Sequence, residues 1–285
     1  SIKLNRIQLF IQILRHKFMR KNFDFDIIEP INIYKVKKSL NLLFYPKKFL
    51  MNYSVFKLLR FIKHFFIFKK KNDDRFTLSL WKSRPKLSDW NSSHPYDRHY
   101  IYHTSWAARR LYKATPEKHI DISSDIRFSS FISVFTSTEF YDIRKVELIL
   151  SGLSTNRANL LELPFESESV ESLSCMHVVE HCGLGRYGDI VNPRSDLKAM
   201  EELQRVLSPG GKLFFVVPIA GKPRIEFNIH RVYSHDQILS IFSNLKLEEF
   251  TLIPDSPKFG DLVESPSKNM LNLQKYACGC YIFTK

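Results

Sequence analysis

The stretch that decides the fold runs from Val170 to Pro218 and reads VESLSCMHVVEHCGLGRYGDIVNPRSDLKAMEELQRVLSPGGKLFFVVP. Residues 170–178 carry apolar side chains at Val170, Leu173, Cys175, Met176 and Val178, and this segment predicts a strand. A helical pattern with apolar residues on one face follows, and it ends at Ser208-Pro209-Gly210-Gly211. The continuously apolar residues 213–218 predict a second strand directly after this turn.

Two apolar strands joined by a crossover helix of this length form a βαβ unit within a parallel sheet. Ligands of such sheets bind at the carboxyl ends of the strands. The first strand ends at a polar cluster made of His177, Glu180 and His181. The sequence therefore predicts a ligand site around these three side chains.

Several short motifs carry a resemblance to the class I S-adenosylmethionine-dependent methyltransferases. They are Leu163-Pro164-Phe165, the Glu180-His181 pair and the run from Glu202 to Gly211. A closer resemblance is to an uncharacterised methyltransferase-like family that is known only as a domain of unknown function. Its marks lie within residues 118–285 and are His177–His181, Gly183–Asp189, Phe227–Val232 and Tyr276–Cys280.

The resemblance implies a Rossmann-like α/β sheet of the class I methyltransferase type from about Lys118 to the C-terminus. Residues 245–253 and 274–284 are expected to form its last two strands, as an antiparallel pair at the edge. The connection between them, residues 255–271, has a length that often belongs to a functional lid. The predicted domains are a basic helical and aromatic extension, residues 1–115, and a methyltransferase-like domain, residues 116–285.

The positive charge of the chain is concentrated at its N-terminal end. The whole chain carries a net charge of +14, and residues 1–71 hold 17 Lys or Arg against 3 Asp or Glu. The remaining residues hold 26 of each sign, so the first quarter of the chain accounts for the whole excess. An asymmetry of this kind predicts a segment that interacts with a partner.

Two segments of this quarter, residues 7–20 and 55–71, have the pattern of a basic amphipathic helix. In the second segment Lys57, Arg60 and Lys63 fall on one face, and Phe and Leu side chains fill the other. Such helices pack on a neighbouring domain or a second subunit, or they lie on an anionic membrane surface. Both alternatives stay open, and nucleic acid is disfavoured because no recognition motif accompanies the charge.

The resemblance also implies where S-adenosylmethionine would bind. The loop after the first strand, Ser123-Ser124-Asp125, lacks the glycines that this family usually has there. Asp142 ends the second strand, where an acidic residue bonds the ribose hydroxyls, and Asn159 is expected to contact the adenine amino group. The implied cofactor-binding residues are Asp121, Ser123, Ser124, Asp142, Asn159, Leu160 and His177.

His181, His177 and His230 are the candidate general bases, because imidazole titrates near neutral pH. His181 comes first, since it adjoins the implied donor site and follows Glu180. The alternative is that Glu180 and His181 form a structural hydrogen-bonded pair. Residues 177–181 also fit the His-x-x-Glu-His pattern of zinc peptidases, but that site requires a helix. Because a strand runs into the motif and Gly183 follows closely, no metal site is predicted.

The residues implied to bind the methyl acceptor are Glu180, Arg186, Tyr187, His230 and Arg231. The planar guanidinium groups suit an anionic acceptor, and the alternative is that they form structural ion pairs. The aromatic and His-rich residues 75–110 predict either a cap over the pocket or a packing layer.

We therefore expect a methyltransferase that uses S-adenosylmethionine to methylate a small or glycan-linked, anionic acceptor such as a nucleotide sugar. Two alternatives remain open. One is a catalytically inactive methyltransferase-like binding or scaffold protein, which the missing glycines favour. The other is a non-methylating sugar-nucleotide enzyme on the same fold.

The four cysteines form no Cys-x-x-Cys motif, which predicts reduced thiols. No apolar run approaches the length needed to cross a bilayer. These features predict a cytoplasmic protein. Peripheral attachment at the inner face of the membrane and a homo-oligomer are further expectations.

Overall fold

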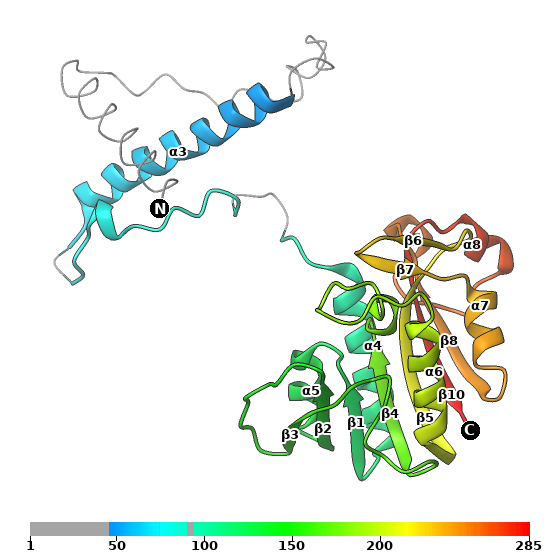
Figure 1. The fold of residues 1–285 in the computed structure, drawn as a ribbon. Coiled ribbons are helices and arrows are strands. Elements are labelled where there is room, and N and C mark those ends of the chain that lie inside the picture. Colours follow the sequence, from blue (N-terminus) through cyan, green and yellow to red (C-terminus); the bar gives the residue numbers. More distant parts are fainter. Residues whose placement is uncertain (1–45, 74, 90–93) are drawn as a thin grey trace. The chain divides into compact units, whose positions relative to one another are not determined.

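The computed structural model describes residues 46–73, 75–89 and 94–285 (Figure 1). The chain divides into two compact units, residues 1–94 and 95–285. This boundary precedes position 115, where the sequence places it. Helix α4 (Arg98–Ala114) belongs to the second unit, because its buried face packs in the core of that unit. The helix predicted at residues 7–20 lies outside the described residues.

In the first unit, helix α3 (Pro46–Lys71) contains the predicted basic helix, and the short 3-10 helix η1 (Leu80–Lys82) follows it. Three lysines in the last turn of α3 interact favourably with the helix dipole. Large apolar side chains of α3 are exposed, among them Phe56, Phe66 and Phe68. No helix in the described ranges has the length and apolarity that crossing a membrane requires. Binding of this helix to an anionic surface stays a prediction.

Among the described residues, the second unit is built on one eight-stranded sheet and a two-stranded hairpin. Strands β3, β2, β1, β4 and β5 run parallel, and β10 runs antiparallel to both β5 and β8. The hairpin consists of β6 (Arg224–Glu226) and β7 (His230–Val232). In spatial order the sheet contains β3 (Leu153–Arg157), β2 (Ser137–Asp142), β1 (Lys118–Ile122), β4 (Val170–Met176), β5 (Leu207–Ile219), β10 (Ala277–Thr284), β8 (Lys246–Ile253) and β9 (Val263–Glu264).

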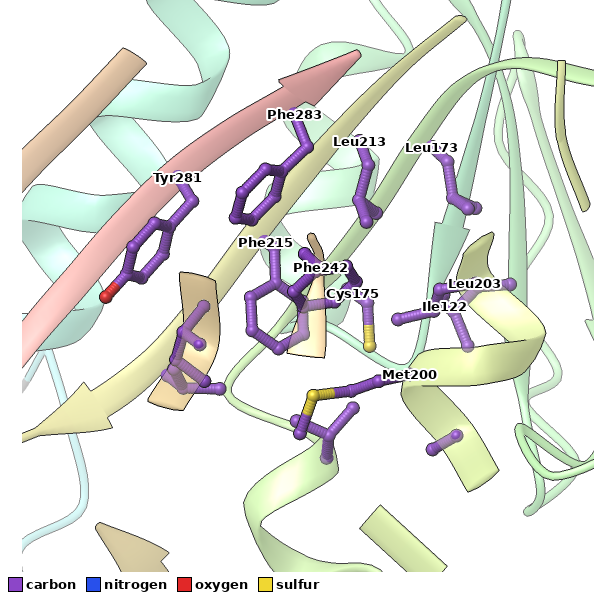
Figure 2. Packing of buried hydrophobic residues seen from close by; sticks show 14 of the residues in the cluster. Ile122, Leu173, Cys175, Met200, Leu203, Leu213, Phe215, Phe242, Tyr281 and Phe283 are labelled. Carbon is purple, nitrogen blue, oxygen red and sulfur yellow. The ribbon is translucent and has the colours of Figure 1, made fainter. Parts of the chain in front are cut away.

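Helices cover both faces of this sheet. The core on one face includes α4 and α5 (Ile126–Ile132), and the core on the other includes α6 (Ser195–Val206) and α7 (His235–Ile241). Neighbouring strand residues point to opposite faces, so Phe214 of β5 packs beside Trp106 while Phe215 packs against Phe242. Figure 2 shows the second of these cores, in which the rings of Phe215, Phe242 and Phe283 gather.

The strand order defines a Rossmann-like α/β fold with an antiparallel strand between β5 and β8, which confirms the fold class expected from the sequence. The chain leaves β1 toward β2 and β3 on one side, and it returns to β4 and β5 on the other (Figure 1). The order therefore reverses between β1 and β4. Open α/β sheets bind ligands at such a switch point, outside the carboxyl ends of the strands.

Some element boundaries differ from those that the sequence predicts. Strand β4 ends at Met176 instead of residue 178, because His177 takes a left-handed conformation with φ of 58°. Strand β5 begins at Leu207, directly after α6, because Leu207 already pairs with Val170. The turn at residues 208–211 is therefore part of the strand. The antiparallel pair expected for the last two strands is present as β8 and β10.

The connection between β8 and β10 has its own secondary structure. It contains the 3-10 helix η3 (Pro257–Phe259), strand β9 and helix α8 (Lys268–Leu273). Strand β9 pairs with β8 and so extends the sheet by one short strand at this edge. A role for this connection as a lid stays a prediction.

Candidate functional site

The loops after β1 and β4 meet at the switch point and resemble each other in conformation. Each begins with a non-glycine residue at positive φ, Ser123 at 57° and His177 at 58°. Such conformations are uncommon outside glycine and are often found at functional sites. The Met176 backbone N–H donates to Ser124 Oγ at 3.1 Å, which ties the two loops together. The Ser-rich loop thus adopts at Ser123 a conformation that glycine adopts freely.

Asp121, predicted to help bind the cofactor, lies inside the protein with no exposed surface. Its Oδ1 accepts from Ser174 Oγ at 2.6 Å, and its Oδ2 accepts from Ser129 Oγ on α5. Burial raises the pKa of Asp121 to about 6, although the serine hydroxyls oppose this rise. The carboxyl therefore joins β1, β4 and α5, and both of its oxygens already have partners.

A buried histidine continues this polar network between β1 and β4. His119 Nδ1 lies 2.8 Å from Ser172 Oγ, and its Nε2 lies 2.9 Å from Ser174 Oγ. Since Ser174 donates its hydroxyl proton to Asp121, Nε2 of His119 donates to Ser174 and Nδ1 accepts from Ser172. Burial lowers the pKa of His119 to about 3, which keeps the ring neutral.

Asp142, the predicted ribose ligand, ends β2 and is buried. It accepts from the Arg144 backbone N–H at 2.8 Å and from the Arg144 guanidinium at 3.1 and 3.3 Å. The same guanidinium lies over the ring of Tyr187, 5.1 Å from its centroid. Tyr187 belongs to the loop after β4, so this loop reaches across to the end of β2.

The remaining nucleoside candidates follow β3. Asn159 Oδ1 accepts from the Leu161 backbone N–H at 3.0 Å, which closes a local turn. In the described ranges the side-chain NH₂ group of Asn159 makes no hydrogen bond, so it can donate to a ligand. Leu160 is buried in the core at 7 % exposure. The structure therefore places Asn159 at the carboxyl end of β3, and Leu160 behind it.

A cavity of about 410 Å³ opens beside the end of β4. Its walls come from residues 97–100 at the start of α4, from the segment after β4, from the β6–β7 hairpin and from Tyr276 before β10. Six residues proposed from the sequence line it, namely His177, Glu180, His181, Arg186, Tyr187 and His230. All walls belong to the second unit.

His177 and Glu180 form a buried pair at this cavity. His177 Nδ1 lies 2.9 Å from Glu180 Oε1, and its Nε2 lies 3.4 Å from Cys278 Sγ. Burial, and then the charge of His181, lowers the pKa of His177 to about 3. Burial raises the pKa of Glu180 to about 7. Glu180 Oε2 has no hydrogen-bond partner among the described residues, so it is available to a group bound in the cavity.

His181 is held in one tautomer. Its Nδ1 lies 2.7 Å from the Ile229 carbonyl oxygen, which can only accept, so Nδ1 carries the proton. Nε2 then keeps its lone pair, and it lies 3.9 Å from Glu180 Oε1. A carboxylate at this distance stabilises a protonated imidazole. Of the three candidate bases, His181 thus has the ring nitrogen best prepared to take a proton.

Aromatic rings form a stacked column along the cavity. His230 stacks on Tyr276, Tyr276 on His99 and His99 on His177, with centroid distances of 5.1, 5.1 and 5.7 Å. Tyr100 also stacks on His177, at 5.4 Å. His230 Nε2 lies 3.3 Å from Glu226 Oε2 without hydrogen-bond geometry.

The two predicted acceptor arginines lie in different environments. Arg186 is exposed at the cavity, where its guanidinium lies over Tyr187 and donates to the Ile229 carbonyl at 3.1 Å. Asp189 holds this loop in shape, because its carboxylate accepts from the backbone N–H groups of Gly183 and Tyr187. Arg231 points elsewhere.

Arg231 is 5 % exposed and does not line the cavity. Its guanidinium lies 3.4 Å from Asp196 and donates to the Cys182 carbonyl at 2.6 Å. This arrangement is the structural ion pair that the sequence left as an alternative. Sequence reasoning did not name His99, Tyr100 or Tyr276 as site residues, although the first two lie in the aromatic and His-rich segment before residue 110.

A family model described as a Caenorhabditis protein of unknown function, DUF268, matches residues 162–253. This range includes the loop after β4 and the β6–β7 hairpin, but not β1, β2 or α4. No curated protein matches the sequence.

Solved structures with a similar fold include three methyltransferases. A putative sarcosine dimethylglycine methyltransferase from Galdieria sulphuraria is 16 % identical, with 65 % of this chain and 86 % of that chain covered and a TM-score of 0.47. The 1,6-didemethyltoxoflavin-N1-methyltransferase from Burkholderia thailandensis, solved with S-adenosylhomocysteine, is 13 % identical, with coverages of 65 % and 79 % and a TM-score of 0.46. The N-methyltransferase NodS from Bradyrhizobium japonicum, also with S-adenosylhomocysteine, is 13 % identical, with coverages of 70 % and 91 % and a TM-score of 0.42.

Proposed function

We propose that this protein transfers a methyl group from S-adenosylmethionine to a small acceptor bound in the cavity beside β4. The observation that carries the proposal is the position and state of His181. Its Nε2 keeps a lone pair, lies near a buried carboxylate and borders a cavity next to the switch point of the sheet. A base placed there serves proton removal from an acceptor oxygen or nitrogen.

The residues at the carboxyl ends of β1, β2 and β3 fit a nucleoside cofactor. Asp142 offers a carboxylate to the ribose hydroxyls once the exposed Arg144 side chain turns aside. The Ser123 conformation gives the loop after β1 the backbone that a glycine would give it. Asn159 would accept from the adenine amino group through Oδ1, which keeps a second lone pair beside its bond with the Leu161 backbone N–H. When bound, S-adenosylmethionine supplies an electrophilic methyl group to the acceptor.

The protein side of the reaction consists of positioning and proton removal. The aromatic column and Tyr100 give the cavity flat walls that orient a small acceptor. His181 Nε2 takes the proton from the attacking atom, and Glu180 stabilises the resulting imidazolium. His177 is turned toward Glu180 and Cys278, so we assign it a positioning role.

An anionic, glycan-linked or nucleotide-sugar acceptor is the substrate class that we favour. Arg186 is an exposed cation that lines the cavity, and its guanidinium lies over the ring of Tyr187, 5.2 Å from the ring centroid. Arg98 also lines the cavity, but it is engaged with Asp261 at 2.7 Å. Arg186 therefore carries the expected contact with the acceptor's charge.

A second candidate function is binding without catalysis. Both oxygens of Asp142 accept hydrogen bonds from Arg144, which competes with a ribose for the same carboxylate. The two functions are separated by incubating the purified chain with methyl-labelled S-adenosylmethionine and a panel of nucleotide sugars and neutral glycosides. Formation of labelled product together with S-adenosylhomocysteine supports methyl transfer. Retention of all label on the cofactor across the panel would favour the binding protein.

Arg186→Met is expected to raise the KM for an anionic acceptor by about tenfold or more, because it removes a charge-assisted contact of roughly 1.5–3 kcal/mol. The KM for S-adenosylmethionine should change little, since Arg186 does not contact the residues after β1 to β3. Steady-state kinetics with each substrate varied in turn measure both values.

Arg109→Met is the matched control, because Arg109 is an exposed arginine of α4 outside the cavity that donates only to the Ser105 carbonyl among the described residues. Its kinetics should equal those of the unaltered protein. An unchanged acceptor KM in Arg186→Met, or a preference of the unaltered enzyme for a neutral acceptor, would show that the anionic assignment is wrong.

A further inference from the structure

A cluster of metal-ligand atoms lies behind the proposed acceptor site. His99 in the first turn of α4, His177 after β4 and Cys278 on β10 each contribute one ligand atom to this cluster. These atoms all lie within 4.8 Å of one another. The three residues are far apart in the sequence, so the fold itself assembles the cluster.

The separation between His177 and Cys278 is close to that of two ligands in a tetrahedral metal site. Zinc binds imidazole nitrogen at about 2.0–2.1 Å and thiolate sulfur at about 2.3 Å, which places the two ligand atoms about 3.5 Å apart. His177 Nε2 and Cys278 Sγ lie 3.4 Å apart. His99 lies at the cavity wall and is half-buried, and its ring stacks on those of His177 and Tyr276. To complete the set, this ring would have to turn its nitrogen toward the other two ligand atoms.

The environment of His177 is that of a metal-binding histidine. Its other ring nitrogen, Nδ1, lies 2.9 Å from Glu180 Oε1. A carboxylate in this position fixes the tautomer that leaves Nε2 free to bind a metal, and it increases the basicity of the ligand. Glu180 is 1 % exposed, and its Oε2 has no hydrogen-bond partner among the described residues. The positive charge of a bound cation would offset the negative charge of this buried carboxylate.

Ligand chemistry and access narrow the choice of ion. Two imidazoles and one thiolate suit zinc and related transition metals, whereas magnesium and calcium require oxygen ligands. His99 and His177 both line the cavity, so a fourth coordination position would face it. Cys280 Sγ lies 3.9 Å from Cys278 Sγ, on the buried side of the cluster.

We infer that His99, His177 and Cys278 bind one zinc-class divalent ion whose fourth position opens into the cavity. Binding converts the Cys278 thiol to a thiolate and releases its proton to solvent, so one proton leaves for each ion bound. The ion would offer a water or substrate oxygen a coordination position beside His181. The inference goes beyond methyl transfer, because, of the residues implied to bind the cofactor, it uses only His177, whose ring is turned toward Glu180 and Cys278.

Cobalt(II) titration of the metal-free full-length chain tests this inference. Cobalt(II) replaces zinc in such sites, and its bond to a thiolate gives a charge-transfer absorption in the near ultraviolet. We expect that absorption to saturate at one equivalent and to disappear when zinc(II) is added. No absorption at any cobalt concentration would overturn the inference. The readout contains neither nucleoside nor acceptor, so it is independent of the proposed function.

Variants assign the absorption to the cluster. Cys278→Ser should abolish it, and Cys182→Ser should retain it, because Cys182 contacts Val178 and does not line the cavity. His99→Ala replaces a half-buried ligand at the cavity wall and should weaken cobalt affinity at least tenfold, and Glu180→Gln should weaken it about 10–100-fold. Circular dichroism verifies that each variant is folded. An absorption that survives both Cys278→Ser and His99→Ala would place the metal elsewhere.

Discussion

His181→Ala is expected to lower kcat for methyl transfer by about 10²–10⁴-fold, the range over which a positioned general base contributes to catalysis. The reason is which of the two ring nitrogens carries the proton. Nδ1 donates to the Ile229 carbonyl, so Nε2 is the nitrogen that can accept the acceptor's proton, and Glu180 lies 3.9 Å away to stabilise the charge. Alanine removes this nitrogen and leaves the residues after β1 to β3 unchanged.

Cofactor affinity should therefore remain within about twofold of the unaltered value while kcat falls. His235→Ala is the control, because His235 stacks on Tyr281 and does not line the cavity. Single-turnover measurements with saturating acceptor separate the chemical step from product release. An unchanged rate in His181→Ala would move the role to His230 or remove it from histidine. A parallel loss of cofactor affinity would indicate a structural role instead.

Asp121→Asn is expected to gain stability relative to the unaltered protein as the pH rises. The folded protein raises the pKa of Asp121 from 3.8 to about 6, chiefly because the carboxyl is fully buried. Below pH 3.8 the group is protonated in both folded and unfolded chains. Between pH 3.8 and 6 the unfolded chain ionises this carboxyl, whereas the folded protein holds it as the neutral acid. The unfolding free energy of the unaltered protein therefore falls as the pH rises through 6.

Each pKa unit corresponds to about 1.4 kcal/mol, so the difference in unfolding free energy between variant and parent should grow by about 3 kcal/mol from pH 4 to pH 8. Urea unfolding at several pH values measures it, and titrations elsewhere in the chain cancel in the difference. Asp236→Asn on α7 is the matched control, because its carboxyl is exposed. A difference that does not vary with pH would mean that Asp121 is ionised in the fold at little cost.

The arrangement of the sheet could be predicted from few residues. The apolar strands around 170–178 and 213–218 and the helical pattern between them define a βαβ unit, and the structure contains it as β4, α6 and β5. The limits of these elements were less predictable. Apolar periodicity does not reveal that His177 turns at positive φ, or that Leu207 pairs with Val170 immediately after the helix.

The candidate site could be predicted only where its residues follow a strand. His177, Glu180, His181 and Arg186 belong to one loop, so strand topology alone brings them to the cavity. His99 and Tyr276 come from α4 and from the start of β10, and their approach depends on helix packing that a single sequence does not specify. Arg231 was likewise not predictable from the sequence. Its charge alone predicts contact with an anionic ligand, whereas in the structure it is buried and forms an ion pair with Asp196.

The structural role of Asp121 was not predicted, because it depends on side chains of the neighbouring strand β4 and helix α5. Its position before the loop resembles that of a cofactor ligand, yet Ser174 and Ser129 occupy both of its oxygens. A signal was present in the sequence, because His119 and Asp121 alternate on one face of β1 and Ser172 and Ser174 alternate on β4. Such period-two pairs of polar residues within buried strands indicate a network across the strands.

We propose that the carboxyl ends of β1 to β4 bind the nucleoside of S-adenosylmethionine. Calorimetric titration of S-adenosylhomocysteine into the full-length chain tests this binding most directly. We predict saturable binding at one site. Asp142→Ala should weaken it about 10–150-fold, since loss of hydrogen bonds to a charged acceptor costs roughly 1.5–3 kcal/mol. Glu147→Ala, which removes an exposed carboxylate paired with Lys145, should leave the affinity unchanged. The absence of binding up to millimolar nucleoside would contradict the account.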